Sequence, residues 1–233
     1  MFGVITDPSP PVRACGLTKH YGARTVLRQI DLELAAGRAV ALRGGNGAGK
    51  TTLLRCLASL LRPTSGQVWW FGRAAFESPA LRRWVGMVAH ESRLYPHLTL
   101  HENLLFVGRM YGVPEPAGRA DQLLADAGLA AHGERLPGQV SRGMAQRVAV
   151  ARALVHQPPI LLLDEAFSGL DVDGHGWLMN TLSALRAGGC AICFTTHDPA
   201  VADQLADETW ELHRGRLYQV STPSSQTVLA RAA

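Results

Sequence analysis

The sequence of 233 residues lacks any run of 18 or more apolar residues, which excludes a membrane-spanning helix within it. Its first residues lack the basic and then apolar segments of a secretory signal, so we expect the chain not to be secreted. Its four cysteines are too few for a disulfide scaffold in a chain of this length. These absences favour a cytoplasmic protein.

Charge is also sparse, because Asp, Glu, Lys and Arg together make up 18% of the residues and the formal net charge is +4. The basic residues are dispersed, and Arg82 with Arg83 comes closest to a cluster. A solvated mixed surface is therefore favoured over a nucleic-acid-binding face. Apolar residues make up 47% of the chain, which is enough for one substantial core.

Strand-like and helix-like segments alternate along the chain. Short apolar or β-rich runs predict strands at residues 38–43, 67–71, 85–88, 160–163 and 191–195. Helical periodicity predicts helices at residues 50–61 and 172–187, and a terminal hairpin is predicted at residues 209–220 around Arg214-Gly215. The alternation predicts an α/β fold with a parallel sheet covered on both faces.

One long segment departs from this alternation. Residues 91–158 carry helical periodicity with few strand signals, which predicts a helical block inserted into the α/β core. Proline and serine predict flexible tails at residues 1–11 and 221–233. We therefore expect one domain over residues 12–220.

A glycine-rich motif carries the strongest chemical signal. Residues 44–51 read Gly-Gly-Asn-Gly-Ala-Gly-Lys-Thr, between a predicted strand and a predicted helix, as in a phosphate-binding loop. Glycines let successive backbone N–H groups face an anion, and the helix N-terminus adds its dipole. Lys50 would supply positive charge to the β- and γ-phosphates, and the Thr51 hydroxyl would bind Mg²⁺. The alternative is a glycine-rich turn that only caps a helix.

Two carboxylates follow the predicted strand at residues 160–163. Asp164 and Glu165 stand at its carboxyl end, which is the ligand-facing end of a strand in a parallel sheet. Asp164 would hold Mg²⁺, and Glu165 would polarise the attacking water. The alternative is a solvated acidic turn.

Further motifs resemble those of the ABC ATPases in kind and order. Residues 140–147 (Val-Ser-Arg-Gly-Met-Ala-Gln-Arg) are similar to their LSGGQ signature, and residues 168–171 (Ser-Gly-Leu-Asp) to their D-loop. Residues 195–197 (Thr-Thr-His) resemble their switch-histidine loop, and Tyr21 resembles the aromatic residue that stacks on adenine. The resemblance covers about residues 12–220. It implies a P-loop NTPase core with a mainly parallel sheet, an antiparallel β subdomain and an inserted helical subdomain.

The resemblance also implies ATP and Mg²⁺ as cofactors, and two cassettes, as a homodimer or a pair, that close head to tail on ATP. Apolar periodicity predicts a helix that runs to about His156, with Ser141 as its N-cap. Ser141 and Gly143, at the start of this helix in one cassette, would cap the ATP held by the other. The residues that the resemblance and the loop motif place at the nucleotide are Tyr21, Gly44, Gly45, Asn46, Gly47, Ala48, Gly49, Lys50, Thr51, Thr52, His90, Ser141, Arg142, Gly143 and Asp171. The residues expected in catalysis are Lys50, Glu165 and His197, and the expected metal ligands are Thr51 and Asp164.

The sequence departs from the family pattern at four positions. His90 stands where the family has the Q-loop glutamine, and Ala166 stands where it has a proline. In the signature, Arg142 and Met144 replace a glycine and a glutamine. Imidazole lacks the carbonyl oxygen of an amide, so His90 differs from glutamine as a partner for Mg²⁺. The expected phosphate and metal residues are all in place, and we expect an active ATPase.

Residues 93–104 resemble the stretch that lines the family's groove for a membrane subunit, which implies a transport ATPase at the cytoplasmic face of the cell membrane. Residues 102–112 resemble exporter-type cassettes more than nutrient importers. Residues 89–92 and 141–144 resemble the ATP-binding subunit of the haem exporter of cytochrome c maturation. This resemblance implies haem export. The alternatives are export of a drug, lipid or polysaccharide, an ATP-switched module without hydrolysis, and a soluble ABC ATPase.

Cys190 and Cys193 have the spacing of a metal or redox motif. Residues three apart on a strand point to opposite faces, so we expect two buried thiols that behave as small apolar groups. Trp69 and Trp70 are expected to pack on a sheet rather than to bind a ligand.

Overall fold

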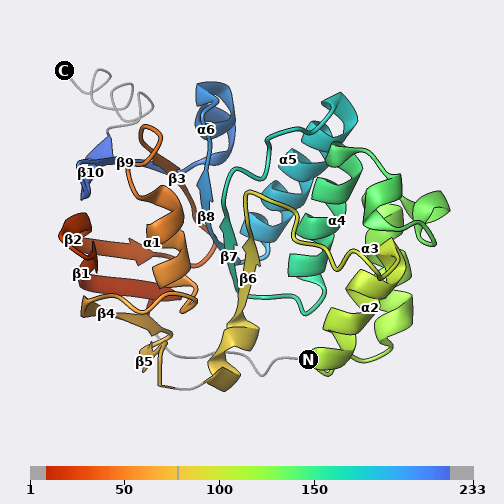
Figure 1. Cartoon of the computed structure of the whole chain (residues 1–233), viewed down its shortest axis with the longest axis horizontal. Coiled ribbons are helices and arrows are strands. Elements are labelled where there is room, and N and C mark those ends of the chain that lie inside the picture. Colours follow the sequence, from red (N-terminus) through yellow and green to blue (C-terminus); the bar gives the residue numbers. More distant parts are fainter. Residues whose placement is uncertain (1–8, 78, 221–233) are drawn as a thin grey trace, which may run out of the picture.

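The computed structural model describes residues 9–77 and 79–220, which form two sheets and a group of helices (Figure 1). The smaller sheet is antiparallel and has the order β2-β1-β4-β5. Its strands are β1 (Val12–Tyr21), β2 (Arg24–Leu34), β4 (Ser65–Trp70) and β5 (Arg73–Ala74). This sheet is the antiparallel β subdomain that the sequence analysis expects.

The larger sheet has the order β10-β9-β3-β8-β7-β6, and all its neighbours are parallel except the hairpin of β9 and β10. Its strands are β3 (Ala39–Arg43), β6 (Val85–Val88), β7 (Ile160–Leu163), β8 (Ala191–Thr195), β9 (Glu208–His213) and β10 (Arg216–Val220). Every residue of β7 and β8 is buried, as expected for strands covered on both faces.

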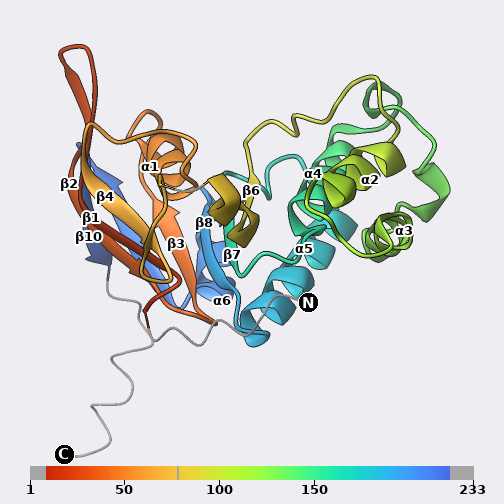
Figure 2. The same cartoon turned by 90° about the horizontal axis from the view of Figure 1, so that it is seen from below.

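The helices divide between the core and an inserted subdomain. They are α1 (Lys50–Leu57), α2 (Leu100–Met110), α3 (Pro116–Asp126), α4 (Arg142–Leu154), α5 (Val172–Ala187) and α6 (Pro199–Leu205), with 3₁₀ turns at Pro79–Trp84, Ala130–His132 and Pro137–Gln139. Helices α2, α3 and α4 come between β6 and β7 in the chain, and α2 and α3 lie on the side of α4 that faces away from the sheets (Figure 2). The predicted helical insertion is therefore present. None of the described helices is long and apolar enough to cross a membrane.

The two faces of the larger sheet belong to two separate apolar cores. One core joins α1 and the smaller sheet to the face that carries Val40 and Leu162. The other joins α2 to α6 to the face that carries Ala41 and Leu161. Alternate residues of each strand thus serve different cores, which fixes the register of the sheet because a shift of one residue would exchange the two faces.

The buried cysteines follow the same alternation. Cys190 packs in the core of α2 to α6, whereas Cys193 packs in the core of α1 and the smaller sheet. The prediction that the two side chains face opposite ways is confirmed. Burial raises the pKa of each thiol to about 12, so both stay protonated at neutral pH. Trp70 is also fully buried, and its indole N–H donates to the Leu57 carbonyl oxygen at 2.9 Å.

The first helix is shorter than predicted. The sequence analysis extends it to Leu61, but α1 ends at Leu57 and the Leu60 side chain is 61% exposed. Ser59 takes a left-handed conformation with φ of 53°, which stops the helix, and Pro63 follows two residues after Leu61.

The predicted tails lie mostly outside the described residues, at residues 1–8 and 221–233. Within the described part of the first tail, Pro11 is buried and its carbonyl oxygen accepts a hydrogen bond from the Phe71 N–H at 3.3 Å. This contact joins the chain to the smaller sheet just before β1.

Candidate functional site

The glycine-rich loop connects β3 to α1, as its motif predicts. Gly44 and Gly49 have φ of 144° and 109°, in a region that disfavours residues with a side chain. A Cβ atom on Gly49 would lie 2.9 Å from Val26 Cγ1, and one on Gly44 would lie 2.5 Å from the Leu212 carbonyl oxygen. The loop therefore needs glycine at both positions, for backbone conformation and for space.

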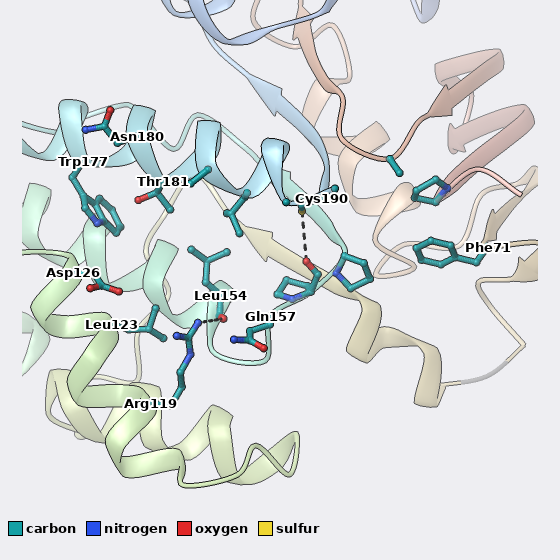
Figure 3. A pocket seen from close by; sticks show the side chains of 18 residues that line it. Phe71, Arg119, Leu123, Asp126, Leu154, Gln157, Trp177, Asn180, Thr181 and Cys190 are labelled. Atoms are coloured by element: carbon teal, nitrogen blue, oxygen red, sulfur yellow. Dashed lines mark hydrogen bonds between the residues drawn. The ribbon is translucent and has the colours of Figure 1, made fainter. Parts of the chain in front are cut away.

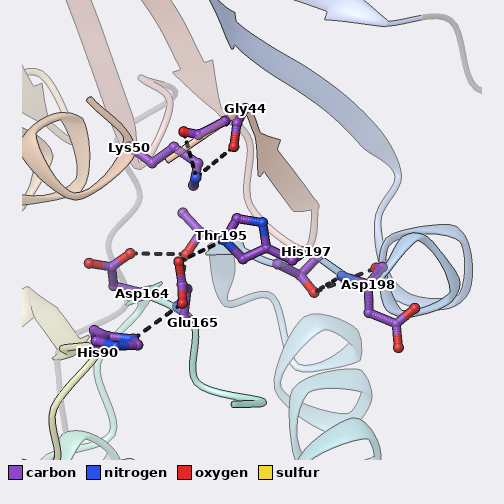
Figure 4. A network of polar contacts seen from close by, with 10 residues as sticks. Gly44, Lys50, His90, Asp164, Glu165, Thr195, His197 and Asp198 are labelled. Carbon is purple, nitrogen blue, oxygen red and sulfur yellow. Dashed lines mark hydrogen bonds and ion pairs between the residues drawn. The ribbon is translucent and has the colours of Figure 1, made fainter. Parts of the chain in front are cut away.

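Lys50 lies inside this loop at the first turn of α1. Its side chain is buried, and Nζ donates to the carbonyl oxygens of Gly44 at 2.6 Å and Gly45 at 3.2 Å (Figure 4). The ammonium group is thus held against the loop backbone, where a bound phosphate would meet it. Gly45, Asn46 and Gly47 are exposed at the rim of the loop, and Thr51 and Thr52 are half-buried in α1.

Asp164 is the buried acid of the site, with 2% of its surface exposed. Its Oδ1 accepts a hydrogen bond from the Thr195 hydroxyl at 3.0 Å, whereas its Oδ2 has no hydrogen-bond partner among the described residues. A buried carboxylate oxygen without a partner is costly unless a ligand satisfies it. Together with the Thr51 hydroxyl it offers the hard oxygen donors that Mg²⁺ prefers, so this donor set fits the expected metal.

Glu165 lies between two histidines (Figure 4). Its Oε1 is 2.9 Å from His197 Nε2, and its Oε2 is 3.2 Å from His90 Nδ1. The residue has φ of 53°, and its backbone N–H donates to the Thr195 hydroxyl oxygen at 2.8 Å. A left-handed non-glycine residue costs free energy, and this one is fixed by contacts from two neighbouring strands.

The topology explains why these residues meet. The glycine-rich loop and the residues Asp164, Glu165, His90 and His197 follow the parallel strands β3, β7, β6 and β8, which are neighbours in the larger sheet. The carboxyl ends of parallel strands lie at one edge, and ligands of open α/β sheets bind there. The structure thus brings together the predicted loop, metal and catalytic residues.

The signature residues form a second group. Ser141 caps α4 by accepting a hydrogen bond from the Met144 N–H at 3.2 Å, which confirms the predicted cap. Gly143 packs so closely on the D-loop that a Cβ atom would lie 2.9 Å from the Gly169 carbonyl oxygen. Asp171 caps α5 through the Gly174 N–H and pairs with Arg147 at 3.2 Å. The signature and the D-loop are therefore one packed unit.

This unit is separate from the phosphate loop of its own chain. In residues 9–77 and 79–220, Ser141, Arg142 and Gly143 make no hydrogen bond or ion pair with that loop. The Arg142 side chain is exposed and lies over Gly169. Tyr21 at the end of β1 is 51% exposed, with Lys19 Nζ 5.4 Å from its ring centroid, and it is therefore open to a stacking partner.

The residues that hold the loop after His90 were not predicted from the sequence. The Arg152 guanidinium donates to the carbonyl oxygens of Arg93 at 2.7 Å and Ser92 at 3.0 Å, and burial lowers its pKa. The fully buried Asn103 donates to three carbonyl oxygens and accepts from the Tyr95 N–H at 2.7 Å. Asn103 is a polar residue on the otherwise apolar buried face of α2. This pattern was the signal in the sequence that could have revealed its role.

Thr195 is a further residue whose role the motif alone did not reveal. Its hydroxyl joins Asp164 to the Glu165 backbone, so it fixes both acids at once. The sequence analysis included it only as part of the switch-histidine loop.

Two hollows formed by described residues border the inserted helices, away from the phosphate loop. One, of about 340 Å³, is lined by residues of the segment after β6, of α2, and of the end of α4 with the turn that follows it, including Arg93, Tyr95, Met110 and His156. The other, of about 980 Å³, lies between α3, α5 and the residues that precede β7 and β8 (Figure 3). Despite its size, the second hollow is at the amino ends of the strands, far from the convergent acids and histidines.

Comparisons with known proteins place the chain in a family. The family described as ABC transporter matches residues 27–168. The Fe(3+) ions import ATP-binding protein FbpC of Vibrio cholerae is 37% identical over 210 residues, which are 89% of this chain and 60% of that protein. The sulfate/thiosulfate import ATP-binding protein CysA of Caulobacter vibrioides is 40% identical over 212 residues, which are 88% of this chain and 62% of that protein. The chain thus spans about 60% of the length of these relatives.

Solved structures agree with the assignment. A structure described as the ATP-binding subunit of an ABC transporter has a TM-score of 0.86 at 30% identity, with 95% of each chain covered. A dimeric post-hydrolysis structure of the ATP-binding cassette MJ0796 bound to ADP and Pi has a TM-score of 0.83 at 27% identity, and covers 91% of this chain and 99% of that one. The relatives named above are import proteins, so they lend no support to an exporter-type or haem-exporter cassette. The chain belongs to the ABC transporter family and has the fold of its ATP-binding cassettes.

Proposed function

We propose that the chain binds and hydrolyses MgATP as the ATP-binding subunit of an ABC transporter. The observation that carries this proposal is the set of groups at the carboxyl ends of β3, β6, β7 and β8. A phosphate loop with an inward lysine, a buried carboxylate oxygen without a partner, and a second carboxylate held by two histidines suit a metal-bound triphosphate.

Each residue has a distinct part in this proposal. The loop N–H groups and Lys50 would hold the phosphates and offset their charge. Thr51 and Asp164 would hold Mg²⁺, which supplies further charge neutralisation at the phosphates. Glu165 would accept a hydrogen bond from the attacking water, and His197, already 2.9 Å from Glu165, would orient the γ-phosphate.

A second cassette would complete the site. Ser141 and the Gly143 N–H stand at the N-terminus of α4, where the helix dipole favours an anion, but they do not contact the phosphate loop of their own chain. We therefore propose that they cap the ATP of a partner cassette. The dimeric form of a structural neighbour supports this arrangement.

An apolar face would bind the membrane subunit. Leu60, Tyr95, Phe106 and Met110 are between 44% and 61% exposed, and Tyr95 and Phe106 contact each other with ring centroids 5.2 Å apart. The hollow of about 340 Å³ lies beside them and is lined by Leu60, Tyr95 and Met110. Exposed apolar residues around a hollow suit an apolar helix of a membrane protein, so this docking face would place the chain at the cytoplasmic side of a membrane.

The direction of transport and the cargo are finer proposals. Haem export is supported by residues 89–92 and 141–144, which are two short motifs. Import is supported by the relatives, whose names specify iron, sulfate/thiosulfate and spermidine/putrescine. Similarity over more than 200 residues outweighs two motifs, and we favour import, with haem export as the second candidate. Proteoliposomes with the co-purified membrane subunits would separate the two by the side on which cargo accumulates.

Turnover tests the enzymatic proposal. Purified chain should hydrolyse MgATP, and Glu165→Gln should reduce turnover by roughly 100-fold or more while ATP binding is kept. Glu211→Gln, an exposed carboxylate on β9, is the matched control and should turn over like the wild type. Wild-type turnover in Glu165→Gln would contradict the role given to this acid.

A further inference from the structure

His90 carries an imidazole where the family pattern has the amide of glutamine, and this imidazole contacts Glu165. His90 follows β6, and its Nδ1 lies 3.2 Å from Glu165 Oε2. The other carboxylate oxygen of Glu165, Oε1, is 2.9 Å from His197 Nε2. Two imidazoles, which follow two different strands, thus contact the two oxygens of one carboxylate (Figure 4).

The backbone holds His90 beside this acid. The Asp164 N–H donates to the Val88 carbonyl oxygen at 2.9 Å, which joins the ends of β6 and β7 two residues before His90. On the other side, Arg152 of α4 binds the carbonyl oxygens of Ser92 and Arg93. The position of His90 is therefore fixed from the sheet and from the helical subdomain.

We propose that His90 is a positioning residue that sets the orientation of the Glu165 carboxylate through Nδ1. This inference rests on the proposed ATPase function and names a new part of the same site. A glutamate side chain has three torsions, and contacts at both oxygens fix the plane of its carboxylate. With Oε2 held by His90, Oε1 faces His197, and the acid is oriented for one water position rather than for several.

This role differs from a direct contact of His90 with the nucleotide or its metal. A positioning residue changes the turnover rate and leaves nucleotide affinity unchanged, because it acts on the acid and not on ATP. A residue that touches ATP or Mg²⁺ changes affinity as well. The two roles also require different atoms, since the contact with Glu165 uses Nδ1, whereas Nε2 would be the ring nitrogen left for the nucleotide or its metal.

Three substitutions separate these roles. Asparagine places its amide N–H₂ where histidine has Nδ1, whereas glutamine reaches farther, to the place of Nε2. We expect His90→Ala to lower kcat by roughly 10- to 100-fold with KM for ATP within about twofold of the wild type. His90→Asn should restore most of kcat, and His90→Gln should restore less. His213→Asn, an exposed histidine on β9, is the matched control and should leave kcat unchanged.

The dependence on Glu165 gives a second measurement. In a Glu165→Gln background the carboxylate is gone, so His90→Ala should cause no further loss of residual turnover. The His90 side chain is 52% exposed, and its truncation removes no core contact, so thermal unfolding should match the wild type.

Three results would overturn the inference. Better rescue by His90→Gln than by His90→Asn would assign His90 to the nucleotide or metal. A raised KM for ATP with unchanged kcat in His90→Ala would also assign His90 to the nucleotide or metal. If the losses of turnover from His90→Ala and Glu165→Gln are fully additive, His90 does not act through that acid. If the wild-type chain fails to turn over MgATP, the proposed function itself is wrong; if Glu165→Gln abolishes turnover but His90→Ala retains it, only this inference is wrong.

Discussion

The two ends of the larger sheet differ in how their polar groups are used. At the amino ends, beside the hollow of about 980 Å³, the Cys190 thiol contacts the Pro158 carbonyl oxygen and the Arg119 guanidinium binds the backbone oxygens of Leu154 and Val155 (Figure 3). At the carboxyl ends, Asp164 keeps an oxygen without a partner in the described chain, and Glu165 faces two histidines. Unsatisfied and convergent polar groups, rather than the volume of a hollow, therefore indicate where chemistry takes place.

Turnover should fall most when the buried acid at the carboxyl ends of the strands is changed. Asp164→Asn keeps the shape of the side chain but removes the charge that we propose for Mg²⁺, so MgATP turnover should fall by roughly 100-fold or more. The same change removes an incompletely paired buried carboxylate, and the nucleotide-free protein should unfold at the same temperature or a higher one. Turnover assays and thermal unfolding measure the two effects. A variant that retains wild-type turnover would remove Asp164 from the site.

The glycine-rich loop gives the next effect. Gly49→Ala places a methyl group 2.9 Å from Val26 Cγ1 on a residue with φ of 109°, so it should lower the free energy of unfolding by about 1–3 kcal/mol. It should also weaken ATP binding, because the loop must shift. Gly45→Ala is the matched control, since its Cβ would meet open space. Urea denaturation compares the two, and equal stabilities would show that the loop tolerates the displacement.

At the amino end of β6, a buried histidine predicts a pH effect on stability. His156 stacks on Tyr111, its Nε2 lies 3.3 Å from the Val85 carbonyl oxygen, and burial lowers its pKa from 6.5 to about 4. The folded state therefore binds this proton less readily than the unfolded state. The contribution of neutral His156 to the free energy of unfolding is complete above pH 6.5 and is lost as the pH falls towards 4.

His156→Phe keeps an aromatic ring against Tyr111 but does not titrate. Over pH 6.5 to 4, the wild type should lose more unfolding free energy than this variant does in denaturant titrations. Parallel losses in both proteins would refute the assignment to His156.

Turnover should change least when a residue that lines the hollow at the amino ends of the strands is replaced. Trp177 lines it from α5 and packs partly against the core. Trp177→Ala should lower the thermal unfolding temperature, since an aromatic contact is lost, but leave MgATP turnover within about twofold of the wild type. A tenfold loss of turnover in a fully folded variant would mean that the two ends of the sheet are coupled.

Local sequence patterns were sufficient for the parallel core. Continuous apolar runs predicted β7 and β8, and Ser141 predicted the start of α4, because burial and capping leave direct traces in the residues involved. The strands β1 and β2 were not predicted, although they are the longest described. Bulges interrupt the pairing of β1 with β2, so the buried positions in β1 do not follow a strict alternation.

The site was predictable as a set of motifs but not as a set of contacts. Lys50, Asp164 and Glu165 follow from spacing, since a loop and strand ends place them at one edge of the sheet. The pairing of His90 with Glu165 depends on how β6 lies beside β7, across 75 residues of sequence, and no local pattern encodes it. The same is true of Arg152, whose partners precede α2.

Light scattering of Glu165→Gln, with and without ATP, tests directly whether two cassettes enclose the nucleotide, because it measures the mass of the protein in solution. If the phosphate loop of one cassette and the Ser141 cap of another enclose the nucleotide, ATP should double the mass, and Ser141→Arg should prevent this. A mass that stays monomeric at saturating ATP, in protein shown to bind the nucleotide, would contradict the proposed site between two cassettes.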